Sequence, residues 1–421
     1  MDFNKMITEL RLTRSAKLLQ VKWKSSQKVM PAGRLPFLAP EFITDVCQAI
    51  FLPLEVTQRA ITVGQRIVAN TALQALAWHY HYCLFCCTTY SEENISCWPS
   101  LTRILQDDGG TFYLLVLLSG LPRTWTIQRM RSIPSEIVRD TLSQVKSKVL
   151  DHHKEHGVWG LTPHYVRWLR NHLCGKLYCL GRLQFQFGFF KFKFRIFRHR
   201  TSRIVVALSE GGVCYLPDGQ LYGSGRVHDT TNTWISQLTL TNDKIVGYPI
   251  LPTGCALQKK VYLSRAEWRE ALSPGDPVLN IHIPKGGPLT FGLCGESFRA
   301  ALKFFPHYFS DKPFVSFCCG SWLLDTQLEE LLSPTSNIIR FQREFYLLPI
   351  HSNDLSLLNR RIFGYIPKDL TKAPRNTSLQ RAILDHLLTG GHLHGGAGGG
   401  FIFPDDLNWD AQVYRRQKFP W

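Results

Sequence analysis

Val278-Leu-Asn-Ile-His-Ile-Pro-Lys-Gly-Gly-Pro-Leu-Thr290, followed by the segment 291–305, is the stretch that decides the fold of the second half of the chain. Its first six residues are rich in β-formers, and Pro284 ends the strand because proline has no N–H for a sheet ladder. The two glycines that follow allow turn conformations that other residues avoid. Apolar residues then recur at helical spacing after Thr290, a candidate N-cap. The stretch therefore predicts a strand, a glycine turn and a helix.

A turn of this kind can bind phosphate. Backbone N–H groups at the start of a helix have no partner within the helix, and the helix dipole is positive there. An ordinary strand-turn-helix junction without a ligand has the same local sequence, so both interpretations stay open. The residues that could bind a phosphate or pyrophosphate are Lys285, Gly286, Gly287, Leu289 and Thr290.

His282 and Asp325 are candidates for catalysis. Asn280 and His282 share one face of the predicted strand, although a strand covered on both faces should be apolar throughout. His282 could act as a base or orient a substrate carbonyl, or it could be a hydrogen-bonded histidine of the core. Asp325 closes the segment Cys318-Cys-Gly-Ser-Trp-Leu-Leu-Asp325, where it could cap the next helix or take part in catalysis.

Composition favours an anionic partner. The 421 residues are enough for two or three domains, and 49 Lys and Arg against 32 Asp and Glu give a formal charge of +17. No acidic residue lies between Glu155 and Glu210, where ten Lys and Arg residues occur. This basic segment could be a solvated face, or it could bind nucleic acid, an anionic membrane surface or a phosphorylated cofactor.

Targeting and metal signals are weak. The first residues lack the basic and then apolar run of a secretory signal, which predicts a cytoplasmic protein. The uncharged segment 67–91 has too many polar groups for a membrane span. It holds His79 and Cys83 one helical turn apart, but core packing is the favoured interpretation and no metal site is expected. The twelve cysteines are expected to be free thiols.

The order of elements predicts an α+β protein. The first part, to about Leu173, has mainly helical periodicity, and strand-like alternation follows. Ser264 with Glu267 has capping-box spacing and predicts a helix there. Later strands are predicted at 314–318, 341–349 and 401–403, a helix at 378–388, and a flexible turn over the glycine-rich run that follows it.

Four segments carry a resemblance to a known family: Ile281-His-Ile-Pro-Lys-Gly-Gly-Pro-Leu289, Cys318-Cys-Gly-Ser-Trp-Leu-Leu-Asp325, Ser336-Asn-Ile-Ile-Arg-Phe-Gln342 and Thr377-Ser-Leu-Gln-Arg-Ala-Ile-Leu-Asp-His386. The chain resembles a bacterial family that pairs a helical N-acyltransferase N-terminal domain with a GNAT-like C-terminal domain. The resemblance implies a helical domain over 1–174 and a GNAT-like mixed sheet domain over 175–350. A C-terminal helix and glycine-rich tail, 351–421, would pack on the second domain.

The family also implies a function. GNAT enzymes place acyl-CoA, including acetyl-CoA, across a splayed parallel pair of strands, and an amine acceptor attacks the thioester directly. By this resemblance, 278–283 would be one strand of the pair and 314–318 its partner. Lys285 to Thr290 would form the pyrophosphate loop, with His282 and Asp325 as catalytic candidates by position. The loop Lys-Gly-Gly-Pro-Leu-Thr departs from the usual Q/R-x-x-G-x-G/A, and Pro288 removes one amide donor. The alternatives are a catalytically silent GNAT-like binding module, or a basic surface for nucleic acid or another polyanion.

Overall fold

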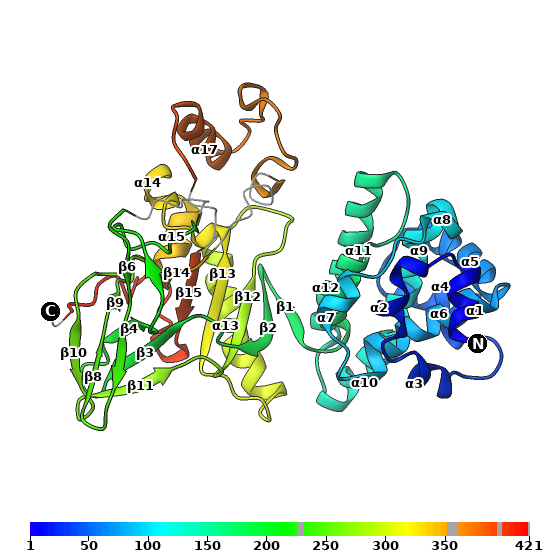
Figure 1. Ribbon diagram of the computed structural model, residues 1–421, viewed down its shortest axis with the longest axis horizontal. Helices are drawn as coiled ribbons and strands as arrows, with labels where there is room; N and C mark the ends of the chain where they lie inside the picture. Colours follow the sequence, from blue (N-terminus) through cyan, green and yellow to red (C-terminus); the bar gives the residue numbers. More distant parts are fainter. Residues whose placement is uncertain (225–230, 352–359, 394–397, 420–421) are drawn as a thin grey trace. The chain divides into compact units, whose positions relative to one another are not determined.

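The computed structural model describes residues 1–224, 231–351, 360–393 and 398–419. The chain forms two compact units, Met1–Cys179 and Leu180–Trp421 (Figure 1). The first is helical and the second is built around β-sheets, so the prediction of an α+β protein is confirmed. The predicted limits at 174 and 350 stay a prediction.

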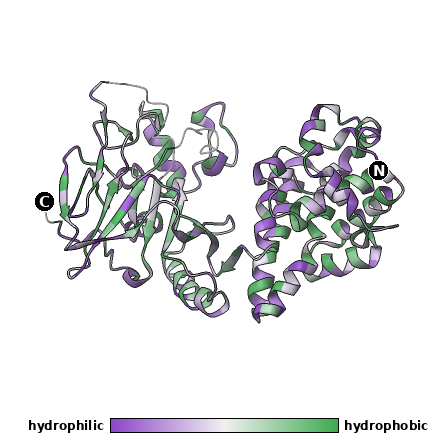
Figure 2. Cartoon of the chain, turned by 60° about the horizontal axis from the view of Figure 1, so that its bottom comes forward, coloured by the Kyte–Doolittle hydropathy of each residue, from purple (hydrophilic) through white to green (hydrophobic). Residues whose placement is uncertain are grey.

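Helices joined by short turns form the first unit as far as Leu173, and the start of β1 completes it. Its most central element is α9, in which nine of ten residues are buried because the sequence is almost continuously apolar. Three of the helices that contact α9, namely α4, α5 and α12, are amphipathic and bury their apolar residues, and Figure 2 shows hydrophobic and hydrophilic residues mixed along the helices of this unit. The helices are α1 (Phe3–Glu9), α2 (Ala16–Gln20), α3 (Trp23–Lys28), α4 (Pro40–Ala49), α5 (Leu54–Val68), α6 (Thr71–His81), α7 (Glu92–Ser96), α8 (Thr102–Leu105), α9 (Gly109–Leu118), α10 (Leu121–Arg131), α11 (Ser135–His156) and α12 (Pro163–Leu173).

The uncharged segment 67–91 is part of this helical core. It forms α6 and a π-helical turn, Tyr82–Cys86. His79 is fully buried, its Nδ1 lies 2.9 Å from the hydroxyl of Ser26, and burial lowers its pKa to about 3. Cys83 Sγ lies 3.7 Å from His79 Nε2. These contacts are those of a packed core histidine.

A mixed sheet is the centre of the second unit. Strands β2 (Leu183–Phe189), β12 (Pro277–His282), β13 (Ser316–Ser321), β15 (Gly398–Ile402) and β14 (Tyr346–Pro349) lie side by side in that order. The pair β12 and β13 is parallel, whereas the other neighbours are antiparallel. β1 (Leu177–Leu180) contains the boundary between the two units.

The helix α13 (Phe291–Tyr308) covers one face of this sheet. Phe298 and Phe305 are buried on its inner side and contact rings from β2 and β13. Phe185 of β2 lies 5.8 Å from Phe298 between ring centroids, and Phe317 of β13 lies 5.2 Å from it. This aromatic layer fixes α13 relative to β2 and β13.

Smaller sheets complete the second unit. β11 (Trp268–Leu272), β3 (Phe194–His199), β4 (Val205–Ser209) and β9 (Pro249–Ile250) form one sheet; β10 (Val261–Ser264), β8 (Lys244–Gly247) and β7 (Leu238–Leu240) form another; β5 (Cys214–Tyr215) pairs with β6 (Trp234–Ile235). The helix predicted after Ser264 is wrong, because that segment forms β11, which pairs with β3. The strand predicted over 341–349 is shorter, since 341–343 belong to α15 (Asn337–Arg343).

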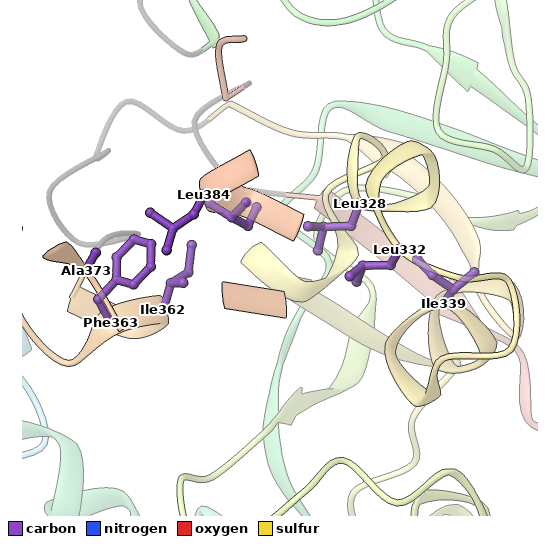
Figure 3. Packing of buried hydrophobic residues seen from close by; sticks show 8 residues of the cluster. Leu328, Leu332, Ile339, Ile362, Phe363, Ala373 and Leu384 are labelled. Carbon is purple, nitrogen blue, oxygen red and sulfur yellow. The ribbon is translucent and has the colours of Figure 1, made fainter. Parts of the chain in front are cut away.

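A small apolar cluster joins segments far apart in sequence (Figure 3). Leu328 of α14 (Leu328–Leu331) and Ile339 of α15 pack with Ile362, Phe363 and residues of α17 (Ser378–Leu388). α17 begins with the capping box of Thr377 and Gln380. The described residues from 360 to 393 are thereby packed against α14 and α15.

The glycine-rich run is partly a strand. Gly398, Gly399 and Gly400 belong to β15, and residues 394–397 lie outside the described residues. A Cβ on Gly398 would lie 1.7 Å from the carbonyl oxygen of Leu324, and one on Gly400 would lie 3.0 Å from Cβ of Phe345. The glycines let neighbouring backbone approach the sheet closely, so the prediction of a flexible turn over these three residues is wrong.

Among the residues that the structure describes, none of the helices is both long enough and apolar enough to cross a membrane.

Candidate functional site

The parallel strands β12 and β13 separate where β12 ends. Their ladder pairs Val278 with Ser316 and stops at the pair Asn280 and Cys318. Beyond that point β12 stays paired with β2 as far as His282, and β13 stays paired with β15 as far as Ser321. Within these described residues each strand keeps its outer neighbour and loses its inner one, so the sheet opens between them.

The two faces of the sheet differ beside this opening. Leu279 and Ile281 lie opposite Phe187 and Phe185 of β2, on the face that α13 covers. Asn280 and His282 are on the other face, opposite Gln186 and Gln184. The polar face expected from the alternation in the sequence is therefore extended by two glutamines from β2.

His282 is held as a neutral imidazole. Burial lowers its pKa to about 4, and its Nε2 lies 2.8 Å from Oε1 of Gln186. With that orientation of the amide, Nε2 carries the proton and donates, and Nδ1 is the basic nitrogen. A neutral histidine at the open end of a strand has the protonation state that a general base needs at pH 7.

Asp325 has a clear structural role. It follows β13 and a short 3₁₀ turn, and its side chain is buried. The carboxylate accepts a hydrogen bond of 3.1 Å from the backbone N–H of Gln327, just before α14. Its own backbone carbonyl accepts from the side chain of Gln342 at 2.9 Å. The carboxylate therefore closes the turn before α14, whose N-cap is Gln327 without a side-chain capping bond, so the predicted role of Asp325 as the helix cap is not observed.

The glycine loop follows β12 directly and leads into α13. Gly286 has φ +109° and Gly287 has φ +131°, values that side chains disfavour, and a Cβ on either would meet no atom within 4 Å. Lys285 is exposed, whereas Leu289 is buried. Thr290 is the N-cap by position, but its hydroxyl makes no capping bond and its N–H donates to the carbonyl of Pro288 at 2.9 Å. The open side of the loop thus presents glycine backbone and the first turn of a helix of 18 residues.

Arg182 contacts the same loop, and sequence reasoning missed it as a site residue. It lies in the turn before β2, and its guanidinium donates to three loop carbonyls: Nη1 to Pro284 at 3.0 Å, Nη2 to Gly287 at 3.1 Å and Nε to Pro288 at 3.0 Å. The sequence placed it only in the basic segment, about a hundred residues before the loop, and offered no local signal for this contact.

Side chains from later elements surround the first residue of α13. The ring of Trp409 stacks on Phe291 at 4.9 Å, and its indole N–H donates to the carbonyl of Phe291 at 3.0 Å. Arg340 of α15 lies over the ring of Phe291, with its Cζ 3.9 Å from the ring centroid, and it pairs with Asp410 at 3.2 Å. The start of the helix is therefore rigidly placed, and an arginine lies beside it.

Much of the basic segment is neutralised by the protein itself. Arg195 pairs with Glu210 and Glu270 at 2.8 Å, and Arg198 pairs with Asp406 at 2.5 Å. Arg203 contacts Asp405 at 3.3 Å. Within the first unit, Arg170 and Lys176 both approach Glu92. A run of basic residues in the sequence is thus divided among several internal ion pairs.

Among the described residues, no group of three or more His, Cys, Asp or Glu side chains could hold a metal ion.

A helical unit followed by a mixed sheet that opens between two parallel strands, beside a glycine loop and a helix start, defines a two-domain protein with a GNAT-like second domain. Family comparison agrees: the profile of the N-acyltransferase N-terminal domain matches residues 41–175, and that of the GNAT-like C-terminal domain matches residues 177–400. The chain belongs to the family with this GNAT-like C-terminal domain, as its resemblance implied.

Solved structures share the fold over nearly the whole chain. They include an acyltransferase mutant in complex with octanoyl-CoA, at 22% identity, and an acyltransferase in complex with decanoyl-CoA and teicoplanin, at 23%. A third is an acyltransferase with CoA and 10C-teicoplanin, also at 23%. Each aligns with a TM-score of 0.64 over 96% of this chain and 99% of the other. No curated protein matches the chain.

Proposed function

We propose that this protein is an N-acyltransferase that moves an acyl group from acyl-CoA to an amine acceptor. The observation that carries the proposal is the glycine loop at the open end of the parallel pair β12 and β13. A phosphate-binding turn beside a splayed pair of strands provides both an anchor for CoA and a slot for its pantetheine arm. The complexes of structurally similar acyltransferases with octanoyl-CoA and decanoyl-CoA support the choice of acyl-CoA.

The loop would bind the pyrophosphate of CoA. The candidates are Lys285, Gly286, Gly287, Leu289 and Thr290, with backbone N–H groups as the main donors and the Lys285 ammonium as a nearby cation. Since the N–H of Thr290 is engaged with Pro288, Thr290 would contribute its hydroxyl. The dipole of α13 would stabilise the phosphates further.

His282 would accept the proton of the acceptor. The neutral amine nitrogen attacks the thioester carbonyl carbon, the C–S bond breaks, and the sulfur of CoA leaves with the electron pair of that bond. His282 takes one proton from the amine and returns it to the leaving thiolate, so the amide and free CoA are the products and His282 is again neutral. Asp325 remains the weaker catalytic candidate, because its buried carboxylate is engaged by the backbone N–H of Gln327 in the turn before α14.

The acceptor is an amine of open identity. Two of the similar acyltransferases are in complexes with teicoplanin or 10C-teicoplanin, which supports a search that includes amine-bearing glycopeptides alongside small amines. We also propose a cytoplasmic location, which the twelve free thiols support because reducing compartments preserve them.

A catalytically silent binding module is the second candidate, favoured by one observation: Pro288 replaces an amide donor within the loop. Incubation of the purified chain with decanoyl-CoA and a panel of amines, followed by mass spectrometry of the products, separates the two. Acylated acceptor and free CoA in equal amounts support the enzyme, and the variant His282→Gln should form much less of both. Binding of acyl-CoA without turnover on any acceptor supports the silent module.

A further inference from the structure

The guanidinium of Arg182 binds the carbonyl side of the glycine loop. Three different nitrogens of one planar group donate to the carbonyls of Pro284, Gly287 and Pro288, at 3.0, 3.1 and 3.0 Å. The donors of arginine are fixed in a rigid fork, so three simultaneous bonds determine the orientation of three peptide planes. No lysine could make the same set, since its ammonium is a single point of donation.

The orientation of these carbonyls decides where the loop amides point. All peptide bonds of the described residues are trans, so each carbonyl and the next N–H point in opposite directions. The carbonyl of Pro284 faces Arg182, and the N–H of Lys285 therefore points away from it. In the same way the carbonyl of Pro288 faces Arg182, so the N–H of Leu289 points away from the guanidinium. The carbonyl of Gly287 precedes Pro288, which has no N–H, so no amide is lost at that position.

Arg182 is also tied to the helix that the loop enters. Its backbone N–H donates to the hydroxyl of Ser297 at 2.9 Å, and that hydroxyl donates to the carbonyl of Leu293 at 2.9 Å. Ser297 is buried, and Gly181, with φ +66°, would place a Cβ 3.1 Å from its oxygen. The turn before β2, the glycine loop and the first turns of α13 thus form one hydrogen-bonded unit.

We propose that Arg182 is a positioning residue for acyl-CoA: it turns the carbonyls of the loop inward and presents the N–H groups of Lys285 and Leu289 to the pyrophosphate. This inference rests on the proposed function. It assigns the preformed shape of the phosphate site to an arginine that lies outside the loop. It also explains how a loop with Pro288 in place of an amide donor can keep a phosphate site.

The test compares Arg182→Lys, which keeps the charge and loses the fork, with Arg182→Met, which keeps an apolar stem. Arg381→Met is the matched control, because Arg381 in α17 donates to the carbonyls of Arg375 and Asn376 at 3.0 and 3.4 Å. Calorimetric titration of the full chain with decanoyl-CoA gives the affinity of each variant. Steady-state kinetics with an acceptor found in the amine panel give KM for each substrate.

Both Arg182 variants should bind decanoyl-CoA about tenfold or more weakly, with KM for the acceptor unchanged, while Arg381→Met behaves like the unaltered chain. Full affinity in Arg182→Lys and loss in Arg182→Met would overturn the inference, since charge alone would then suffice. Full affinity in both would overturn it too, and would leave the proposed function intact. An unaltered chain that binds no acyl-CoA would refute the proposed function and this inference together. If Arg182→Met does not fold, the affinity of Arg182→Lys for decanoyl-CoA still tests the inference: weaker binding than in the unaltered chain supports it, and equal binding overturns it.

Discussion

A negatively charged side chain at position 287 should weaken the binding of acyl-CoA more than an uncharged side chain of the same size does. The two variants to compare are Gly287→Asp and Gly287→Asn, whose side chains have almost the same size and shape. A Cβ at this position meets no atom within 4 Å, so neither variant creates a clash, and both share the strain of a side chain at φ +131°. That strain is on the order of 1–3 kcal/mol for each.

The difference between the variants is electrostatic. A carboxylate at about 6 Å from a phosphate charge is repelled by about 0.7 kcal/mol at a water-like dielectric and by about 2.8 kcal/mol at an effective dielectric of about 20. Gly287→Asp should therefore bind decanoyl-CoA roughly tenfold more weakly than Gly287→Asn, within limits of about three- and a hundredfold. The difference in affinity between the two variants should become smaller at high salt because the charges are screened.

Calorimetric titration of both variants with decanoyl-CoA, at low and high ionic strength, measures this difference. Thermal unfolding without ligand shows that the two variants share the same fold and the same strain. Equal affinity of Gly287→Asp and Gly287→Asn would refute the placement of the phosphates at this loop. A difference that does not respond to salt would refute the electrostatic explanation.

Three further predictions concern the base, the histidines and the core. His282→Ala should reduce acyl transfer by about a hundredfold or more in steady-state assays while leaving the affinity for decanoyl-CoA unchanged; unchanged turnover would remove His282 from the reaction. Burial lowers the pKa of His79 to about 3 and that of His81 to about 4, below about 6.5 in the unfolded chain, so the stabilisation of the folded state is fully present above about pH 6.5 and is lost as pH falls to about 3. The melting temperature of the unaltered chain should fall over that pH window, and that of His79→Leu should fall less. An equal fall in the two proteins would contradict the burial of His79 as a neutral imidazole. Phe298→Ala should lower the free energy of unfolding in urea by about 3–5 kcal/mol, because Phe298 is fully buried. Leu293→Ala, at an exposed position of the same helix, should lower it by less than about 1 kcal/mol, and similar losses for the two variants would contradict the packing of α13.

Local signals in the sequence predicted the elements that carry the candidate site. Pro284 ends β12 close to where the missing N–H predicts, and helical periodicity after Thr290 locates α13. The alternation around His282 predicted a polar face, and the structure places Gln184 and Gln186 on that face. These features depend on neighbouring residues, so they can be read without knowledge of the tertiary structure.

Features that depend on distant contacts could not be predicted in this way. The capping-box spacing of Ser264 and Glu267 indicates a helix, but pairing of the following residues with β3 overrides that local preference. The glycines of β15 are strand residues because Leu324 and Phe345 approach their backbone closely. Arg182 meets its carbonyls across about a hundred residues, and a single arginine in a basic run gives no sign of this contact.

The most direct test of acyl-CoA binding at the glycine loop is hydrogen–deuterium exchange of the full chain with and without decanoyl-CoA. The account predicts slower exchange of the loop amides that have a proton to give, those of Lys285, Gly286, Gly287 and Leu289, and of 291–293 at the start of α13, because the phosphates would accept their hydrogen bonds, and little change in α17. Binding of decanoyl-CoA that leaves exchange over 285–293 unaltered would contradict the account.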